Sequence, residues 1–132
     1  MRVTGRFDVK LTPESNDGGG DGISLARMSI DKRYHGELDA TGKGEMLTAG
    51  TPVKGSAAYV AVERVFGTLQ GRKGSFVLQH SGTMTRGAPS LAVTVVPDSG
   101  TGELAGIAGS MAIVIADGKP SYHSYDFEYT LP

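Results

Sequence analysis

Apolar and polar residues alternate with a period of two along most of the chain. At the N-terminus the odd positions from Val3 to Leu11 are apolar or glycine, and the even positions between them are polar. Similar stretches rich in Val, Tyr and Phe recur through the sequence, separated by glycine-rich or proline-containing turns. We find no window with a convincing helical period and capping residues. The pattern therefore predicts an all-β fold of eight or nine strands.

The strands can be placed approximately along the sequence. We expect the first to end near residue 11 and residues 12–22 to form a loop, because that segment is rich in Asn, Asp and Gly. Two strands, at about 24–34 and 37–48, are expected to join through a two-residue turn at His35 and Gly36. The remaining strands are predicted in SAAYVAVERVFGTLQ, GSFVLQHSGTM, SLAVTVV, GELAGIAG, SMAIVIA and YHSYDFEYTL, with turns at PDSGTG and DGKP.

The short connections favour one architecture. Consecutive strands joined by tight turns are typical of an up-and-down antiparallel sheet, and closing that sheet into a barrel removes its exposed edges. A two-sheet sandwich is the alternative. The length of 132 residues suits a single domain over 1–132 that can bury a core of its own.

Composition narrows the classes of partner. Thirteen Lys and Arg against fourteen Asp and Glu give a net charge of -1. The chain therefore lacks the overall field that attracts nucleic acid or an anionic membrane surface. No segment approaches the roughly 20 apolar residues that a membrane-spanning helix needs, and MRVTGRFDVKL has no apolar core of a signal peptide. With no cysteine in the chain, we expect a cytoplasmic protein.

The glycine and histidine motifs do not predict a cofactor. The glycines of GTGELAG, at positions 100, 102 and 106, are spaced one residue too widely for a dinucleotide fingerprint, and no helix follows them. His35, His80 and His123 lie on three different predicted segments, and no two have the spacing of a metal site. We therefore predict neither a cofactor nor a metal ion.

His80 stands near the end of an otherwise apolar strand, in FVLQHSG. A hairpin turn at Gly71 and Arg72, or a four-residue turn at 70–73, would place Glu63 directly opposite it. Opposed Cβ atoms lie about 4.5–5.5 Å apart, close enough for a carboxylate to orient an imidazole as a general acid or base. The alternative is that the two groups satisfy each other in the core and fix the strand register.

Other side chains of this hairpin complete the predicted site. The face of Glu63 and His80 also carries Tyr59, Phe76 and Leu78, which we expect to form the wall of a ligand cavity. Arg64 falls on the opposite face, either as a snorkelling surface cation or in a second polar layer with Gln79. Glu45 is a further candidate, although neighbouring glycines permit a bulge and leave its face open. In the last strand, the aromatic side is assigned to the core: His123, Tyr125, Phe127, Tyr129 and Leu131.

Three blocks of sequence carry a family resemblance: YVAVERVFGTLQGRKG, SFVLQHSGTMTRG and VVPDSGTGELAGIAG. Together with GEML and FEYTL, they resemble the bacterial domain-of-unknown-function 3224 family. That family is similar to allene oxide cyclase and dirigent proteins, whose glycine-rich turn resembles GTGELAG. The resemblance implies an eight-stranded barrel with an interior cavity, often assembled as an oligomer. The chain has no cyclase motif onto which a catalytic residue can be transferred.

Two hypotheses of different class follow from the sequence. In the first, the barrel binds a small apolar or amphipathic molecule, with Glu63 and His80 at its polar end. If that protein is an enzyme, we expect isomerase or cyclase chemistry in which His80 transfers a proton or stabilises developing charge while Glu63 orients it. In the second, side chains fill the interior, and the barrel is a structural or interaction module. Both faces of the central hairpin look covered, so the outer one would have to meet a partner subunit or an outer layer. With the oligomers that the resemblance implies, we expect a homo-oligomer.

Overall fold

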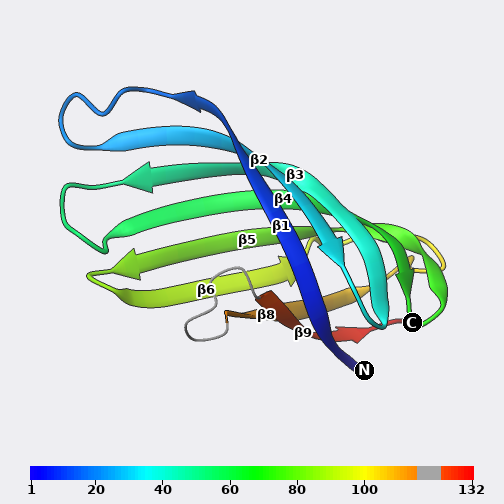
Figure 1. Cartoon of the computed structure of the whole chain (residues 1–132). Coiled ribbons are helices and arrows are strands. Elements are labelled where there is room, and N and C mark those ends of the chain that lie inside the picture. The colour runs from blue at the N-terminus through cyan, green and yellow to red at the C-terminus, as the bar shows by residue number, and fades with distance from the viewer. Residues whose placement is uncertain (116–122) are drawn as a thin grey trace.

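The computed structural model describes residues 1–115 and 123–132, and these residues form strands, turns and loops without a helix. None of them therefore supplies a helix long and apolar enough to cross a membrane. The described strands, shown in Figure 1, are β1 (Arg2–Asn16), β2 (Ser24–Tyr34), β3 (Leu38–Gly50), β4 (Ala57–Leu69), β5 (Arg72–Thr85), β6 (Ala88–Val95), β7 (Thr101–Gly102), β8 (Ala108–Ile115) and β9 (His123–Thr130).

The strands form one antiparallel sheet that closes on itself. Its order is β4-β3-β2-β1-β9-β8-β6-β5, and β4 also pairs with β5, which completes the ring. The two-residue β7 adds to the outer edge of β5 at Gly74 and Ser75. The predicted all-β, up-and-down barrel of about eight strands is confirmed, and the sandwich alternative is wrong.

The barrel is closed along only part of its length. β9 pairs with β1 from Arg2 to Phe7, and β6 meets β8 at Thr94 alone. Beyond these points β1 to β6 continue together as an open six-stranded sheet, which forms the left side of Figure 1. We call this part the open half, and the part that contains β8 and β9 the closed half.

The open half has two edges without a described partner strand, along β1 and β6. Pro13 lies in the β1 edge, and the register of β1 with β2 shifts between Pro13 and Ser15. Pro89 lies in the β6 edge. Proline removes a backbone donor and a bulge twists the strand, so both edges are poor templates for pairing with another chain.

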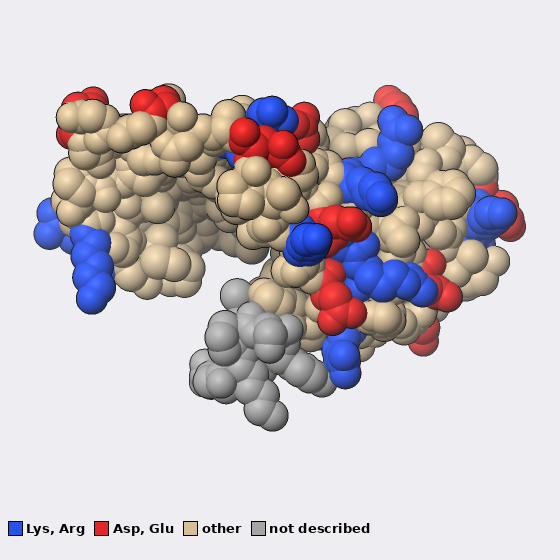
Figure 2. All heavy atoms as spheres, turned by 45° about the horizontal axis from the view of Figure 1, so that its top comes forward, with Lys and Arg blue, Asp and Glu red and all other residues tan. Residues whose placement is uncertain are grey.

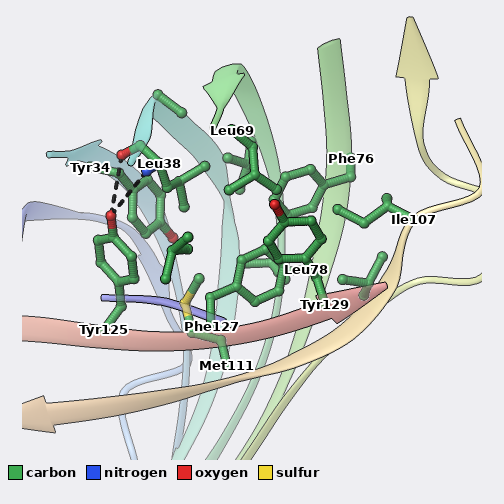
Figure 3. Packing of buried hydrophobic residues seen from close by; sticks show 14 of the residues in the cluster. Tyr34, Leu38, Leu69, Phe76, Leu78, Ile107, Met111, Tyr125, Phe127 and Tyr129 are labelled. Carbon is green, nitrogen blue, oxygen red and sulfur yellow. Dashed lines mark hydrogen bonds between the residues drawn. The ribbon is translucent and has the colours of Figure 1, made fainter. Parts of the chain in front are cut away.

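Large side chains fill the closed half. The Phe127 ring stacks on Phe76 at 5.6 Å and on Tyr129 at 5.4 Å between centroids. Leu104 and Ile107, which are 1% and 2% exposed, also belong to this core. Figure 3 shows these rings and the Ile107 side chain converging from different strands of the barrel. The prediction that the aromatic side of the last strand faces the core is confirmed for Tyr125, Phe127 and Tyr129. On the same side, Leu131 packs against this core and His123 is half-buried.

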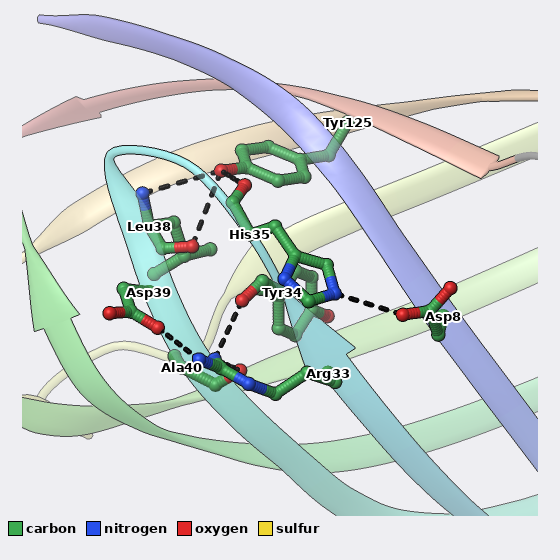
Figure 4. Close-up of polar contacts among 8 residues, drawn as sticks. All are labelled: Asp8, Arg33, Tyr34, His35, Leu38, Asp39, Ala40 and Tyr125. Atoms are coloured by element: carbon green, nitrogen blue, oxygen red, sulfur yellow. Dashed lines mark hydrogen bonds and ion pairs between the residues drawn. The ribbon is translucent and has the colours of Figure 1, made fainter.

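A tyrosine fixes the turn between β2 and β3. The Tyr125 hydroxyl donates to the carbonyl oxygen of His35 at 2.7 Å and accepts from the backbone N–H of Leu38 at 3.3 Å (Figure 4). A Cβ on Gly5 would lie only 2.6 Å from the Tyr125 hydroxyl oxygen. Glycine at position 5 therefore lets the ring cross β1 and reach the turn.

Three predicted boundaries need correction. β1 continues to Asn16 because β2 gives it a partner to that point, so the predicted loop begins later. The last pair of β2 and β3 is Tyr34 with Ala40, which makes their connection longer than two residues. Residues 103–106 of GELAGIAG form a turn instead of a strand, and Leu104 and Ile107 belong to the core. The turn predicted at DGKP lies outside the described residues.

Candidate functional site

Glu63 is the centre of a buried polar cluster on the inner face of the sheet. Its carboxylate is buried between strands, with 0% of its side chain exposed. Oε1 accepts a hydrogen bond from Lys32 Nζ at 2.8 Å and lies 2.7 Å from His80 Nε2, while Oε2 accepts from the Tyr34 hydroxyl at 2.8 Å. Because an ionised carboxylate only accepts, Nε2 carries the proton of this contact. Three donors from β2 and β5 thus converge on one acid from β4.

The predicted contact between Glu63 and His80 is present, but the predicted register is wrong. The turn lies at Gln70 and Gly71, with positive φ values of 48° and 81°, one position earlier than expected. β4 and β5 therefore pair Ala61 with His80 and Glu63 with Leu78. A shift by two residues preserves the face of a strand. The two side chains are consequently diagonal neighbours, and diagonal positions remain within reach of long side chains.

Gly42 of β3 makes room for the carboxylate. A Cβ at this position would lie 2.2 Å from Glu63 Oε2 and 3.1 Å from Tyr34 Cε2. Without a side chain on the intervening strand, groups from β2 reach across β3 to a group on β4. The cluster therefore depends on a glycine as well as on its polar members.

Lys32 and Tyr34 are functional candidates that the sequence reasoning missed. The Lys32 side chain is only 6% exposed, and its Nζ lies 5.0 Å from the centre of the Phe7 ring. The ring faces add favourable electrostatics to the ion pair with Glu63. A signal was present, because Lys32 shares the parity of Ile30 and Tyr34, two apolar or aromatic residues of the same strand. A lysine on the apolar side of a strand indicates a buried partner.

The environment holds Glu63 in its charged form. Burial opposes ionisation and is the largest single influence, but the hydrogen bond from His80 and the charge and hydrogen bond of Lys32 together outweigh it. The pKa of Glu63 consequently lies below its ordinary value. Burial, followed by the charge of Glu63, raises the pKa of Tyr34 well above its usual value. Tyr34 therefore stays protonated and donates to the carboxylate.

This charge state predicts loss of stability in acid. A carboxyl group whose folded pKa is depressed stabilises the fold above its unfolded value of 4.5, and that contribution disappears as the pH falls through the folded pKa. We expect the free energy of unfolding to fall steeply below about pH 4.5. Urea unfolding followed by far-UV circular dichroism measures it, since the chain has no Trp. In the Glu63→Gln variant this acid dependence should be shallower, and an identical profile would contradict the assignment.

The other predicted site residues lie in three different places: the packed core, the outer face of the sheet and the inner face of the open half. Phe76 and Leu78 are 1% and 0% exposed and belong to the packed core, so the expected cavity wall is filled there. Glu45 and Arg64 are exposed on the outer face of the sheet, and Glu45 forms an ion pair with Arg27. Tyr59, by contrast, is half-buried on the inner face of the open half.

The inner face of the open half forms a largely apolar trough. Strand register and alternation place on it Leu11, Met28, Met46, Tyr59, Met84 and Leu91. The space-filling view shows the molecule hollowed beside this half and free of charged side chains between its rims (Figure 2). The Glu63 cluster lies where the trough meets the closed half. Glu63 is the next residue after Ala61 on the inner face of β4.

Tyr59 and His80 form what we call the floor of the trough, where it meets the Glu63 cluster. Each has one polar atom without a hydrogen-bond partner among the described residues. Neither the Tyr59 hydroxyl nor His80 Nδ1 makes a hydrogen bond to a described residue, and neither is among the fully enclosed atoms without one. The His80 side chain is only 3% exposed, whereas Tyr59 is half-buried. A Cβ on Gly82 would lie 2.6 Å from Tyr59 Cε1, so this glycine lets the ring lie flat on the trough. Burial and the nearby charge of Glu63 raise the pKa of Tyr59, which keeps its proton available.

The three histidines have separate surroundings. His35 is exposed and its Nε2 lies 2.9 Å from an Asp8 carboxylate oxygen (Figure 4). The His123 ring lies 5.1 Å from the Phe7 ring, and its Nδ1 is enclosed and makes no hydrogen bond to a described residue. Over residues 1–115 and 123–132, no three His, Asp or Glu side chains gather to hold a metal ion.

Comparison with known proteins identifies the family. No curated protein matches the chain. A crystal structure of a protein of unknown function from the DUF3224 family of Shewanella oneidensis MR-1 is 53% identical, with a TM-score of 0.93 over 100% of this chain and 97% of that one. The model of a family described as protein of unknown function (DUF3224) matches residues 3–129. The barrel with its buried Glu63 cluster therefore belongs to the DUF3224 family.

Proposed function

We propose that the trough binds a small apolar or amphipathic molecule whose polar end lies at His80 and Tyr59. The observation that carries this proposal is an apolar, solvent-accessible inner face that ends at a buried charged cluster. Ligand sites commonly combine such walls with a few convergent polar groups. The packed closed half moves the proposed site from the barrel centre to its open end.

Exposure of the trough residues supports a binding role. Leu11, Met84 and Leu91 are 41%, 43% and 43% exposed. Soluble proteins rarely leave a contiguous apolar surface uncovered unless it contacts something. Methionine is flexible and polarisable, so the three methionines of the trough suit ligands of varied shape.

The polar floor also suits proton transfer. His80 contacts Glu63 through Nε2, which leaves Nδ1 as the ring nitrogen that a bound molecule would have to reach. Glu63 fixes the orientation of the ring through the contact with Nε2. We propose His80 as general acid or base and Glu63 as its positioning residue if the bound molecule reacts. Isomerase or cyclase chemistry of this kind, and a likeness to allene oxide cyclase barrels, stay predictions.

Methionine methyl groups offer a direct test of binding. The chain has five methionines, of which Met28, Met46 and Met84 line the trough, while Met1 and Met111 lie elsewhere. In ¹³C-methyl-methionine NMR, titration with 1-octanol should shift the three trough signals and leave the other two unchanged. Equal shifts at all five methyl groups, or none, would contradict binding in the trough.

Matched substitutions at neighbouring positions sharpen this test. Met84 faces the trough, and Thr83 is exposed on the opposite face of the same strand. Met84→Glu places a charge in the apolar wall and should weaken octanol binding at least about tenfold. Thr83→Glu should change it less than about twofold, because its side chain points away from the trough. Equal effects of the two substitutions would count against the site.

The outer face of the sheet favours a second candidate, an interaction module. Leu47, Val60, Val62 and Phe66 are 52–56% exposed there. A shallow depression of about 240 Å³ opens beside Val62, and its lining also includes Lys43, Glu45 and Arg64. The homo-oligomer expected from the sequence would cover this face, and it remains a proposal, as does a cytoplasmic location. Native mass spectrometry of protein from its own host reports both the subunit number and any retained small molecule.

A further inference from the structure

We propose that the trough selects a planar, uncharged molecule, aromatic or conjugated, that stacks on the Tyr59 ring and meets its hydroxyl with one polar group. The inference rests on the proposed binding function and adds the chemical class of the ligand. It is carried by the position of the ring, by the side chains around it and by the polarity of this wall.

The Tyr59 ring lies against the backbone of β5. A Cβ on Gly82, the residue paired with Tyr59, would lie 2.6 Å from Cε1 and 3.2 Å from Cδ1 of the ring. Gly82 is buried, whereas Met84, the next inner-face residue of β5, is 43% exposed. One face of the ring therefore covers the glycine. Because Tyr59 itself is only half-buried, part of its other face is left open to the trough.

Small side chains surround this ring on its own strand and on β5. Its neighbours on the inner face are Ala57 and Ala61 along β4, Gly82 across β5 and Thr48 across β3. Alanine and glycine add at most a methyl group to the surface of the sheet. A flat molecule can therefore lie on the ring without meeting a bulky side chain on these sides.

Methionines occupy two positions diagonal to Tyr59. Met46 of β3 pairs with Ala61, and Met84 of β5 pairs with Ala57, which places one methionine on each flank of the ring. Diagonal neighbours stand about 7–8 Å apart, within reach of long side chains. A thioether makes favourable contacts with an aromatic ring, often at its edge. These two methionines therefore suit the edges of a planar molecule that stacks on Tyr59.

The polarity of the wall favours an uncharged ligand. Among the residues that the structure describes, the trough is free of charged side chains between its rims, and Lys32 and Glu63 at its end neutralise each other (Figure 2). A charged group bound here would lack a counter-charge, which is costly. The Tyr59 hydroxyl both donates and accepts, so it can pair with a hydroxyl or carbonyl group at the edge of the ligand.

The position of the ring also has a structural explanation. An aromatic side chain across from a glycine shields the backbone of the neighbouring strand. In that case Tyr59 would contribute to stability and would bind flat and puckered molecules equally well. The test must therefore measure a preference between two ligands with the same skeleton, and not the affinity for one of them.

The matched probes are 2-naphthol and decahydro-2-naphthol, which share two fused rings and one hydroxyl and are both uncharged at neutral pH. Only 2-naphthol is planar. In isothermal titration calorimetry on the intact protein, it should bind about three- to tenfold more tightly than its saturated counterpart. Its ring protons should also move upfield in the NMR spectrum, because the ring current of Tyr59 acts above the ring face. Equal affinities would overturn the inference.

Three variants assign the preference to Tyr59. Tyr59→Leu keeps an apolar side chain without a ring and should bring the affinity ratio of the two probes to about one. Tyr59→Phe should keep the ratio, while both probes bind about three- to tenfold more weakly without the hydroxyl. Phe66→Leu removes a ring that is 55% exposed on the outer face and should leave the ratio unchanged. Loss of the ratio in Phe66→Leu would place the stacking there and contradict the assignment.

The inference and the proposed function fail in different ways. If 2-naphthol, decahydro-2-naphthol and 1-octanol all leave the trough methionines unshifted, the binding function itself is wrong. If all three shift them but 2-naphthol binds no more tightly than decahydro-2-naphthol, the function stands and the inference falls. The unmodified protein provides both outcomes, so the decision does not depend on whether a variant folds.

Discussion

Replacing Glu63 with Gln should lower the free energy of unfolding by about 3–5 kcal/mol. The substitution retains the shape of the side chain but leaves the buried Lys32 ammonium without its counter-charge. Its amide N–H₂ group also replaces one acceptor oxygen, so either Lys32 and His80 lose their acceptor or the Tyr34 hydroxyl must accept where it now donates. Urea unfolding at pH 7, followed by far-UV circular dichroism, measures the change.

Two controls separate the buried charge from a general effect of substitution. Glu45→Gln removes an exposed acid that pairs with Arg27 and should cost less than about 1 kcal/mol. The double variant Lys32→Met with Glu63→Gln should be more stable than Glu63→Gln alone, since it removes the stranded ammonium as well. If Glu63→Gln were no worse than Glu45→Gln, the cluster would not contribute to stability.

Gly44→Ala should destabilise the protein by at least about 3 kcal/mol, at the upper end of overpacking effects. A Cβ on Gly44 would lie 1.9 Å from the carbonyl oxygen of Val62 and 2.6 Å from Glu63 Cα. Both are backbone atoms, so no side-chain rotation relieves the clash and β3 must move away from β4. That movement also separates β3 from Glu63 of β4. Thermal unfolding should show a midpoint lower by about 10 °C or more.

Gly50 provides the matched control on the same strand. The nearest atoms to a Cβ at Gly50 belong to Ser24, at 3.9 and 4.0 Å, which is ordinary contact. We expect Gly50→Ala to change the free energy of unfolding by less than about 0.5 kcal/mol. Equal melting temperatures for the two variants would show that β3 does not approach β4 as closely as described.

Alternation along the strands was sufficient to predict most of the fold. A period of two assigns each side chain to a face, so it placed the aromatic side of β9 in the core and put Glu63 and His80 on one side of the sheet. Short turns between consecutive strands predicted the up-and-down order. These inferences use only local spacing, which the chain keeps throughout.

The remaining features depend on distances that local spacing does not contain. The β4–β5 register follows from a turn at Gln70 and Gly71, and a non-glycine residue with positive φ such as Gln70 is uncommon. Lys32 reaches Glu63 only because β3 carries Gly42 between them and the sheet curves. Phe76 and Leu78 have the parity of a cavity wall, but the closure of the barrel by β8 and β9 fills the space before them.

The unequal length of the strands gives the molecule a rigid end and a pliable one. Where β8 and β9 complete the ring, each strand is held by two neighbours and by the packed rings inside. The far ends of β1 and β6 are held on one side alone, and they can fray without disturbing that core. The Glu63 cluster lies at the boundary between the two halves. The closed half therefore fixes its geometry, while the free ends of β1 and β6 beside the trough can move.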